Sequence, residues 1–233
     1  MSPQKAEVEH HEGSIVLDVE KSAGSSHSHQ HAEPFCNVPE HAKKVSNPMA
    51  IGFGAFALGA FLVGITNAGI VTELPQGVLG VALGFSGMGQ FVCGIFEMVA
   101  GNTFAATTML TYAGFWISYG VMFSSGAGFM TAVTAAGEEG MHELHHVIGL
   151  WQIAFAVPSL VFFIGTFKQP WIIRLVLLQV FLTFFFGGLG GLTGVAGLTK
   201  AGAWVSFTLS LTAWYVMTAI LWAEEKVMNL PFF

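Results

Sequence analysis

The chain has 233 residues, of which 53% are hydrophobic and only 9% are charged, and its mean hydropathy is +0.65. A soluble domain carries about 25% charged residues, so this composition is typical of an integral membrane protein. The net charge of −6 arises from acids in the tail, the loops and the C-terminus, and the sequence offers no basic patch that would bind nucleic acid.

Residues 1–45 are polar and rich in histidine, and they predict a disordered cytoplasmic tail. They contain too little apolar surface to offset the conformational entropy of an ordered chain. The six histidines of this tail could bind a transition metal weakly, although a solvated histidine-rich segment needs no ligand to exist. The tail also lacks the basic, apolar and small-residue regions of a signal peptide, so we expect the first membrane helix to direct insertion.

The segment 47–70 predicts the first transmembrane helix. Its 24 residues carry no charge, and at about 1.5 Å of rise per residue they can cross a hydrocarbon core of roughly 30 Å. Ser46 or Asn47 can cap the first turn, and Pro48 is tolerated there because its missing N–H would have no helical partner. The glycines of this segment favour close contact with other helices.

Five further apolar segments follow, so the sequence predicts six membrane spans. They cover residues 77–100, 104–123, 147–167, 171–192 and 201–223. The third span carries threonine, serine and tyrosine residues, so we expect one of its faces to point into the bundle. Pro158 should kink or locally open the fourth span. The glycine-rich stretch 187–197 predicts either the end of a helix or a close crossing.

An even number of spans places both termini on one side of the membrane. With the tail in the cytoplasm, every Lys and Arg except Lys200 lies inside, as the positive-inside rule favours. We therefore expect a six-helix domain at 46–225, a short cytoplasmic C-terminus at 226–233 and an extracellular loop at 124–146.

The loop contains a possible zinc motif. His142, Glu143 and His146 fit H-E-x-x-H, in which two histidines bind zinc and the glutamate acts as a base. The segment between two spans offers no domain for a third ligand and a cleft, so we favour a surface cluster of protonatable groups over a protease. A pH-sensing role for this cluster, which also includes His145, fits better than a protease, because histidine changes charge in the weakly acidic range.

Glu97 lies near the end of the second span and is a candidate functional residue, because an acid inside a membrane is costly to bury. Gln90 lies two helical turns earlier on the same face, so the pair could line a polar path. Alternatively, Glu97 faces headgroup water or caps the turn at Gly101 and Asn102. Both interpretations stay open.

Four motifs resemble those of the acetate uptake transporter family, whose members include the bacterial succinate/acetate proton symporter and fungal acetate transporters also linked to ammonium export. The motifs are NPMAIGF at 47–53, GNTF at 101–104 with TY at 111–112 and FW at 115–116, GLW at 149–151 and GTFK at 165–168. They follow the family's order over residues 47–225. Two departures are Ala50, where the family signature has a second proline, and Gly59, where a bacterial member has threonine.

The resemblance implies an all-α membrane protein with six transmembrane helices per subunit, assembled as a homohexamer with a separate path through each subunit. It also implies that three side chains narrow the path. These correspond to Phe56, Tyr112 and, on the fifth helix, Val180 or, if the register slips by two, Leu182. The polar wall positions correspond to Gln90 and, with less direct matches, to Asn102 and Glu97.

We therefore expect proton-coupled transport of acetate and similar short monocarboxylates across the plasma membrane. Gln90, Asn102, Thr108 and the Tyr112 hydroxyl would bind the carboxylate, and Glu97 would couple the proton. Acetate, protons, membrane lipid and further copies of the chain are the expected partners. We expect no enzyme activity, cofactor or metal site. Two alternatives stay open: a passive channel for small acids or for ammonia and ammonium export, and an acetate-sensing membrane protein.

Overall fold

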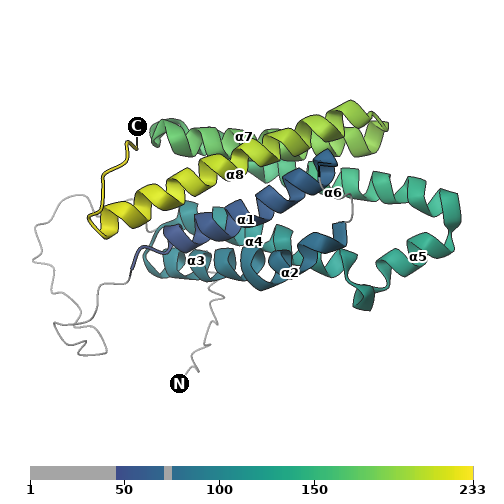
Figure 1. Cartoon of the computed structure of the whole chain (residues 1–233), viewed down its shortest axis with the longest axis horizontal. Coiled ribbons are helices and arrows are strands. Elements are labelled where there is room, and N and C mark those ends of the chain that lie inside the picture. Colours follow the sequence, from purple (N-terminus) through teal and green to yellow (C-terminus); the bar gives the residue numbers. More distant parts are fainter. Residues whose placement is uncertain (1–45, 71–74, 233) are drawn as a thin grey trace, which may run out of the picture. The chain divides into compact units, whose positions relative to one another are not determined.

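The computed structural model describes residues 46–70 and 75–232, and every regular element in these two ranges is helical (Figure 1). The α-helices are α1 (Met49–Ala68), α2 (Leu79–Val81), α3 (Met88–Val99), α4 (Thr103–Phe123), α5 (Phe129–Ala135), α6 (Gly137–Gly165), α7 (Trp171–Thr193) and α8 (Ala196–Glu224). The all-α fold class is thus confirmed. The tail predicted at 1–45 lies outside the described residues.

Within the two described ranges, five segments are long and apolar enough to cross a membrane, so the chain is a multi-pass membrane protein. They are Met49–Ala68, Gln76–Val99, Gly137–Lys168, Trp171–Thr193 and Ala196–Glu224. The sixth predicted span is α4, which has the length of a crossing helix at 21 residues. It is less apolar than the other five because threonine, serine and tyrosine recur along it, and its crossing remains a prediction.

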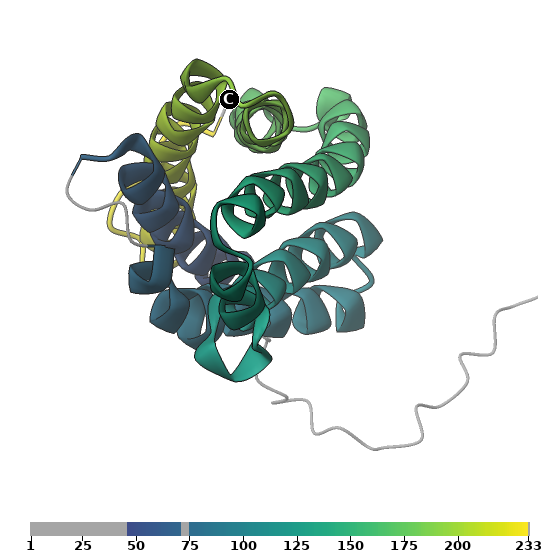
Figure 2. The ribbon, with the colours of Figure 1, turned by 90° about the vertical axis from the view of Figure 1, so that its right-hand side faces the viewer.

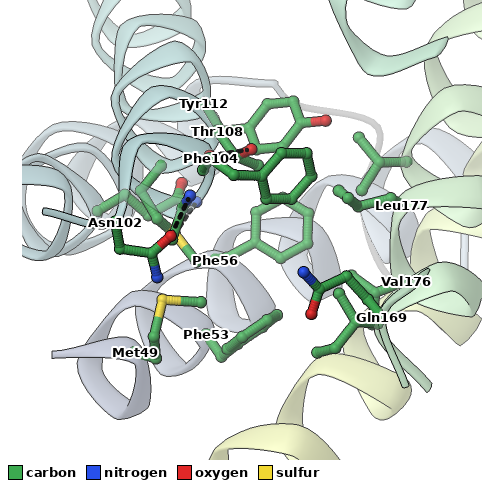
Figure 3. Close-up of a pocket in the computed structure, with 15 residues that line it drawn as sticks. Met49, Phe53, Phe56, Asn102, Phe104, Thr108, Tyr112, Gln169, Val176 and Leu177 are labelled. Carbon is green, nitrogen blue, oxygen red and sulfur yellow. Dashed lines mark hydrogen bonds between the residues drawn. The ribbon is translucent and has the colours of Figure 1, made fainter. Parts of the chain in front are cut away.

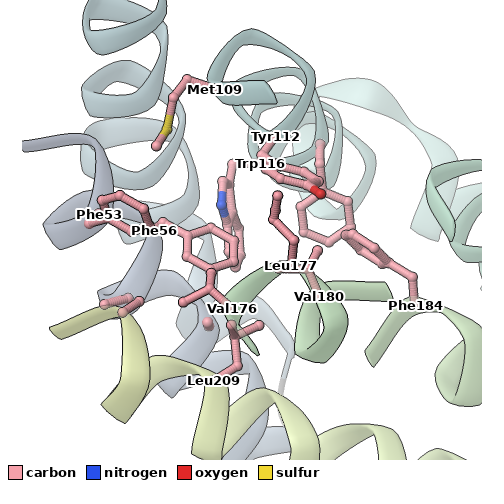
Figure 4. Packing of buried hydrophobic residues seen from close by; sticks show 14 of the residues in the cluster. Phe53, Phe56, Met109, Tyr112, Trp116, Val176, Leu177, Val180, Phe184 and Leu209 are labelled. Atoms are coloured by element: carbon pink, nitrogen blue, oxygen red, sulfur yellow. The ribbon is translucent and has the colours of Figure 1, made fainter. Parts of the chain in front are cut away.

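The long helices pack as neighbours around a common centre. α3 packs on α1, α1 on α8, α8 on α7, α7 on α6, and α4 contacts both α3 and α6, so this order closes into a ring. Figure 2 looks along the helices and shows this arrangement. The side chains that point inward form one buried cluster rich in aromatic rings (Figure 4).

Glycines allow two of these helix pairs to approach closely. A Cβ atom added at Gly64 on α1 would lie 2.8 Å from the backbone nitrogen of Phe207 on α8, and one at Gly191 on α7 would lie 2.8 Å from Cα of Gly149 on α6. α7 then ends at Gly194, whose φ of +71° is a conformation that favours glycine. The stretch 187–197 is therefore both a close crossing and a helix end.

The prediction of a loop over 124–146 was wrong for most of its length. α5 and the first turns of α6 are helical there, and α6 continues through Pro158. Glu138 and Glu139 lie in the first turn of α6, where negative charge interacts favourably with the helix dipole. Polar composition identified an exposed segment, but exposure does not exclude a helix. α8 likewise begins at Ala196 instead of residue 201, and thus includes Lys200.

The second span is not one regular helix. A 3₁₀ turn (Pro75–Val78), the short α2 and a π-helical stretch (Ala82–Gly87) precede α3. Wider turns of this kind often occur at functional sites. Within this stretch the hydroxyl of Ser86 donates to the carbonyl oxygen of Ala55 on α1 at 2.7 Å. The irregular stretch is therefore joined to α1 directly before Gln90.

Candidate functional site

A cavity of about 140 Å³ lies inside the ring, between α1, α3, α4 and α7. A water molecule needs roughly 10–15 Å³, so the cavity has room for a small organic molecule. Most of its wall is apolar or aromatic, with four amide or hydroxyl side chains among the lining residues besides Tyr112 (Figure 3). The lining residues are Met49, Phe53, Phe56, Gln90, Asn102, Phe104, Ala105, Thr108, Met109, Tyr112, Gln169, Ile173, Val176, Leu177 and Val180.

Six of the seven predicted site residues line this first cavity. They are Phe56, Gln90, Asn102, Thr108, Tyr112 and Val180. They come from four helices or their termini and from positions up to 124 residues apart, which follows from their numbering. Leu182, the alternative to Val180, is half-buried and lines none of the cavities described below. Glu97 does not line the cavity.

Aromatic rings and an aliphatic side chain close the first cavity at one end. The rings of Phe56 and Tyr112 lie 5.8 Å apart between centroids, and Phe184 lies 6.3 Å from Tyr112. Val180 faces them from α7 and is 1% exposed. Figure 4 shows these side chains converging within the buried cluster. We call Phe56, Tyr112 and Val180 the neck.

The sequence predicted that the Tyr112 hydroxyl binds the carboxylate, but in the structure this hydroxyl donates to another side chain. It donates to Oγ of Ser159 on α6 at 3.1 Å, and Ser159 donates in turn to the carbonyl oxygen of Phe155 at 2.7 Å. Ser159 is fully buried. The tyrosine therefore presents its ring to the cavity, while Ser159 fixes the position of that ring.

Gln90 is the buried polar side chain of the cavity with the weakest partner. Its Nε2 lies 3.6 Å from the sulfur of Met109, and its Oε1 makes no hydrogen bond within the protein although the residue is 1% exposed. The Thr108 hydroxyl, by contrast, donates to the carbonyl oxygen of Phe104 at 2.8 Å. A thioether is a weak acceptor, so the Gln90 amide has hydrogen-bonding capacity left for a ligand.

Asn102 joins α3 to α4 at the other end of the first cavity. α3 ends in a Schellman turn: Gly101 has φ +79°, its N–H donates to Met98, and the N–H of Asn102 donates to the carbonyl oxygen of Glu97. The Asn102 side chain then caps α4, because its Oδ1 accepts from the N–H of Ala105 at 3.2 Å.

Glu97 is connected to the first cavity by a hydrogen bond with Asn102, which lines it. Nδ2 of Asn102 donates to Oε2 of Glu97 at 2.6 Å, and Glu97 is 5% exposed. An amide nitrogen has two hydrogens, so Asn102 keeps one donor for the cavity. The contact ties the end of the second span to the turn, as one of the two interpretations expected, and it also places the acid one hydrogen bond from the cavity.

Two more cavities lie beyond the neck. A second one of about 30 Å³ shares Phe56 and Val180 with the first and is also lined by Trp116 and Thr183. A third one of about 410 Å³ lies at the opposite ends of the helices. Its lining residues are Asn67, His145, Ile148, Gln152, Gly187, Gly190, Gly191, Gly194, Ala196, Thr199 and Lys200. One face of α7 contributes to all three.

Among the described residues, six buried side-chain polar atoms have no hydrogen-bond partner in the protein, and four of them belong to residues that line these cavities. The four are Oε1 of Gln90 in the first cavity, Nε1 of Trp116 and Oγ1 of Thr183 in the second, and Oε1 of Gln152 in the third, whereas Nε of Arg174 and Oε1 of Gln179 lie outside all three. Buried polar groups are normally satisfied. A row of such atoms beside cavities is what a path for a polar solute or for water requires.

The sequence did not predict Trp116, Ser159, Thr183 or Gln152 as site residues, although Trp116 belongs to the FW motif at 115–116. A serine directly after Pro158 and an amide within a span were the available signals for Ser159 and Gln152. The departure at Gly59 has a structural reason: an added Cβ would lie 2.5 Å from Oγ of Ser86 and 2.7 Å from the ring of Trp116. No side chain fits there unless those neighbours move.

The fold, in which long apolar helices surround internal cavities, is that of a helical membrane protein. The GPR1/FUN34/yaaH family matches residues 30–232, and the chain belongs to this family. The predicted family resemblance is therefore confirmed. It covers all of the cavities described above.

Curated relatives and a solved structure agree with this assignment. Acetate permease A of Emericella nidulans is 32% identical over 184 residues, which cover 75% of this chain and 61% of the relative. The succinate-acetate/proton symporter SatP of Escherichia coli K12 is 24% identical over 189 residues, covering 81% and 92%. This chain spans less than two thirds of the length of the fungal relatives it matches.

The structure of a bacterial protein described as the acetate channel SatP matches with a TM-score of 0.70 at 22% identity. The match covers 82% of this chain and all of the bacterial one. At this identity the likeness establishes a shared fold.

Proposed function

We propose that this protein carries acetate and similar short monocarboxylates across the plasma membrane, with a proton, along the path formed by the three cavities. The observation that carries the proposal is the first cavity itself, in which the incompletely bonded amide of Gln90 lies among apolar side chains beside an aromatic neck. The family and the names of the relatives, an acetate permease and a succinate-acetate/proton symporter, support this substrate class.

The walls of the first cavity suit the two ends of acetate differently. Gln90 and the second N–H of Asn102 can donate to the carboxylate, and the apolar side chains near Phe56 and Val180 can contact the methyl group. A longer acid has a larger volume and would have to pass through the same narrow space between the side chains of the neck. The geometry therefore favours short monocarboxylates over larger acids.

A proton lowers the cost of passing the neck. Neither Lys nor Arg is among the residues that line the first and second cavities. A bare carboxylate would lose its hydration there without a compensating positive charge, which is expensive in an apolar environment. Acetate should therefore cross as the neutral acid or together with a proton carried by the protein.

Glu97 is the proposed proton carrier, acting through Asn102. As a carboxylate, Glu97 accepts a charge-assisted hydrogen bond from Nδ2 of Asn102, and such bonds are roughly twice as strong as neutral ones. Protonation of Glu97 weakens this bond and frees the Asn102 amide to bind an entering carboxylate. Substrate and proton would then favour each other's binding.

The number of membrane spans, the orientation of the chain and its oligomeric state form part of the same proposal. We propose six spans with α4 as the sixth, both termini in the cytoplasm, a membrane domain at 46–225, a C-terminal segment at 226–233 and a homohexamer. We propose no enzyme activity or cofactor. With this orientation, the first cavity faces the cytoplasm and the third faces outward, because the starts of α1 and α8 lie at opposite ends of the path.

Uptake of labelled acetate into vesicles containing the purified full-length chain tests the proposal. Accumulation above equilibrium when an inward proton gradient is imposed, abolished by a protonophore, is the expected result. Uptake that only equilibrates would show a passive channel. Flux of ammonia without acetate would show the export alternative, and binding of acetate without flux would show a sensor.

A further inference from the structure

A compact group of metal-binding side chains lies on α6, outside the three cavities. His142 and His146 are four residues apart, which places them on the same face of the helix, and their ring centroids lie 4.4 Å apart. Nδ1 of each histidine lies 3.8 Å from Oε1 of Glu143. Their side chains are 70%, 39% and 65% exposed in the order His142, His146, Glu143.

We propose that His142, Glu143 and His146 bind a divalent transition-metal ion, and that Zn²⁺ is the ion their chemistry favours. One potential ligand atom from each residue lies within 4.8 Å of the other two. Two donors bonded to one zinc ion at about 2.1 Å in tetrahedral geometry are about 3.4 Å apart. The two 3.8 Å separations therefore need to shorten by a few tenths of an ångström, and the separation between the two histidines, which is at most 4.8 Å, by no more than about 1.4 Å. Side-chain rotation can supply these shifts without any change in the backbone.

The donor set selects the class of ion. Two imidazole nitrogens and one carboxylate oxygen suit zinc and its neighbours in the transition series, whereas Ca²⁺ and Mg²⁺ prefer sites made of oxygen atoms. Three protein ligands leave the fourth position of a tetrahedral ion for water. The helix fixes the spacing of the two histidines before the ion arrives, so little conformational entropy is lost on binding.

The site is a surface site without a substrate cleft. The same residues match the H-E-x-x-H pattern of metalloproteases, but there the glutamate serves as a base beside a cleft. Here Glu143 lies within reach of both histidines, and all three side chains are at least partly open to solvent, while Leu144 points into the core. The expectation that the chain holds no metal site is thereby replaced by a specific proposal.

The position of the site links it to the third cavity. His145 lies between the ligands in sequence and lines that cavity. An ion bound by both His142 and His146 would cross-link the second and third turns of α6. These turns form this part of the cavity wall. Metal binding should therefore stabilise the outer end of α6 against local unfolding.

Zinc titration of the purified full-length chain by isothermal calorimetry tests the proposal directly. The protein is made without a histidine tag, and the tail histidines are replaced by glutamine so that they do not contribute heat. These are His10, His11, His27, His29, His31 and His41. On this background we expect one saturable zinc site, and no binding of Mg²⁺ or Ca²⁺ at the same concentrations.

Matched variants locate the ion. His142→Ala combined with His146→Ala should abolish the site, and Glu143→Gln should weaken it by about tenfold or more, since even partners of metal ligands contribute 10- to 100-fold in affinity. His145→Ala is the control and should leave zinc affinity unchanged. Zinc should also raise the melting temperature of the parent protein but not of the double variant.

Two results would overturn the proposal. One is a parent protein that shows no saturable zinc binding. The other is a double variant that binds zinc as tightly as the parent. Both measurements are made in detergent without a substrate, so they do not depend on whether the chain transports acetate.

Discussion

The two large cavities of the path differ in size, in lining and in charge. The first, about 140 Å³, has aromatic and aliphatic walls with Gln90 buried among them. The third, about 410 Å³, is lined by four glycines together with Asn67, Thr199 and the exposed Lys200. A small apolar space with few donors can discriminate between solutes better than a wide space lined by glycines and by several polar side chains. Selection should therefore occur at the first cavity and the neck, and the third should only collect the anion.

The largest effect is expected at Gln90. Gln90→Leu keeps the volume but removes the amide that would donate to the carboxylate. A hydrogen bond to a charged group contributes about 1.5–3 kcal/mol, so the transport efficiency for acetate, kcat/KM, should fall roughly ten- to a hundredfold. Rates of labelled-acetate uptake in vesicles over a range of concentrations measure this.

Gln179→Leu is the matched control for this substitution. Gln179 is a half-buried glutamine on α7 whose Nε2 lies 3.3 Å from the Thr208 hydroxyl on α8, and it lines none of the three cavities. It should retain near-normal uptake. Equal losses in the two variants would mean that any buried glutamine in the bundle matters for folding, and that Gln90 has no special contact.

Glu97→Gln should separate accumulation from flux. Glutamine keeps the shape and can still accept the hydrogen bond from Asn102, so the turn between α3 and α4 should survive. It cannot carry a proton. We expect accumulation driven by a pH gradient to disappear while downhill exchange of acetate continues at a reduced rate. A variant that concentrates acetate with normal pH dependence would show that Glu97 is structural and that the proton travels on the substrate.

Phe56→Ala should widen the neck. Removing the ring leaves a gap beside Tyr112 and Val180 through which larger acids can pass, so uptake of lactate or succinate relative to acetate should increase several-fold. Core truncation of this kind also costs about 3–5 kcal/mol of stability, so the amount of folded protein is measured in parallel by size-exclusion chromatography.

Phe61→Ala is the control for the neck. Phe61 lies on the same helix but packs against Phe207 and Trp214 of α8, with ring centroids 5.7 and 5.2 Å away. It should lower stability without changing the ratio of lactate to acetate uptake. Unchanged selectivity in folded Phe56→Ala protein would identify Phe56 as packing only.

The sequence predicted most of the helices because runs of about 20 apolar residues are a strong local signal. The predicted spans 104–123 and 171–192 differ from α4 and α7 by one residue at one end. The prediction from the sequence failed over 124–146, because polar residues indicated an exposed segment and this segment was predicted to be a loop. The sequence could not predict the π-helical stretch, since no local pattern specifies that one turn is wider than the next.

The sequence predicted which residues meet at the first cavity better than what each of them does there. Family motifs singled out Tyr112 and Asn102, but the availability of their hydrogen atoms depends on partners elsewhere. The Tyr112 hydroxyl is bonded to Ser159, 47 residues away, and one amide hydrogen of Asn102 is bonded to Glu97. Only once these bonds are known can Gln90 be recognised as the buried side chain with hydrogen-bonding capacity left for a ligand.

The smallest effect is expected at Lys200, and it sharpens the contrast between the cavities. Lys200 is exposed and lines only the third of them, so it should attract acetate without binding it tightly. An exposed charge contributes about 0–1 kcal/mol, and its influence is screened over roughly 10 Å at 0.1 M salt. Lys200→Gln should therefore raise KM for outside acetate by about two- to fivefold at low salt.

Two features distinguish this effect from a change in selection. It should vanish when the ionic strength is raised, and the ratio of lactate to acetate uptake should stay constant. Lys168→Gln, which removes an exposed lysine at the other end of α6, is the control and should leave KM for outside acetate unchanged. If Lys200→Gln instead lowers uptake as strongly as Gln90→Leu and does so at every salt concentration, the third cavity contains a binding site of its own, and selection is shared between both ends of the path.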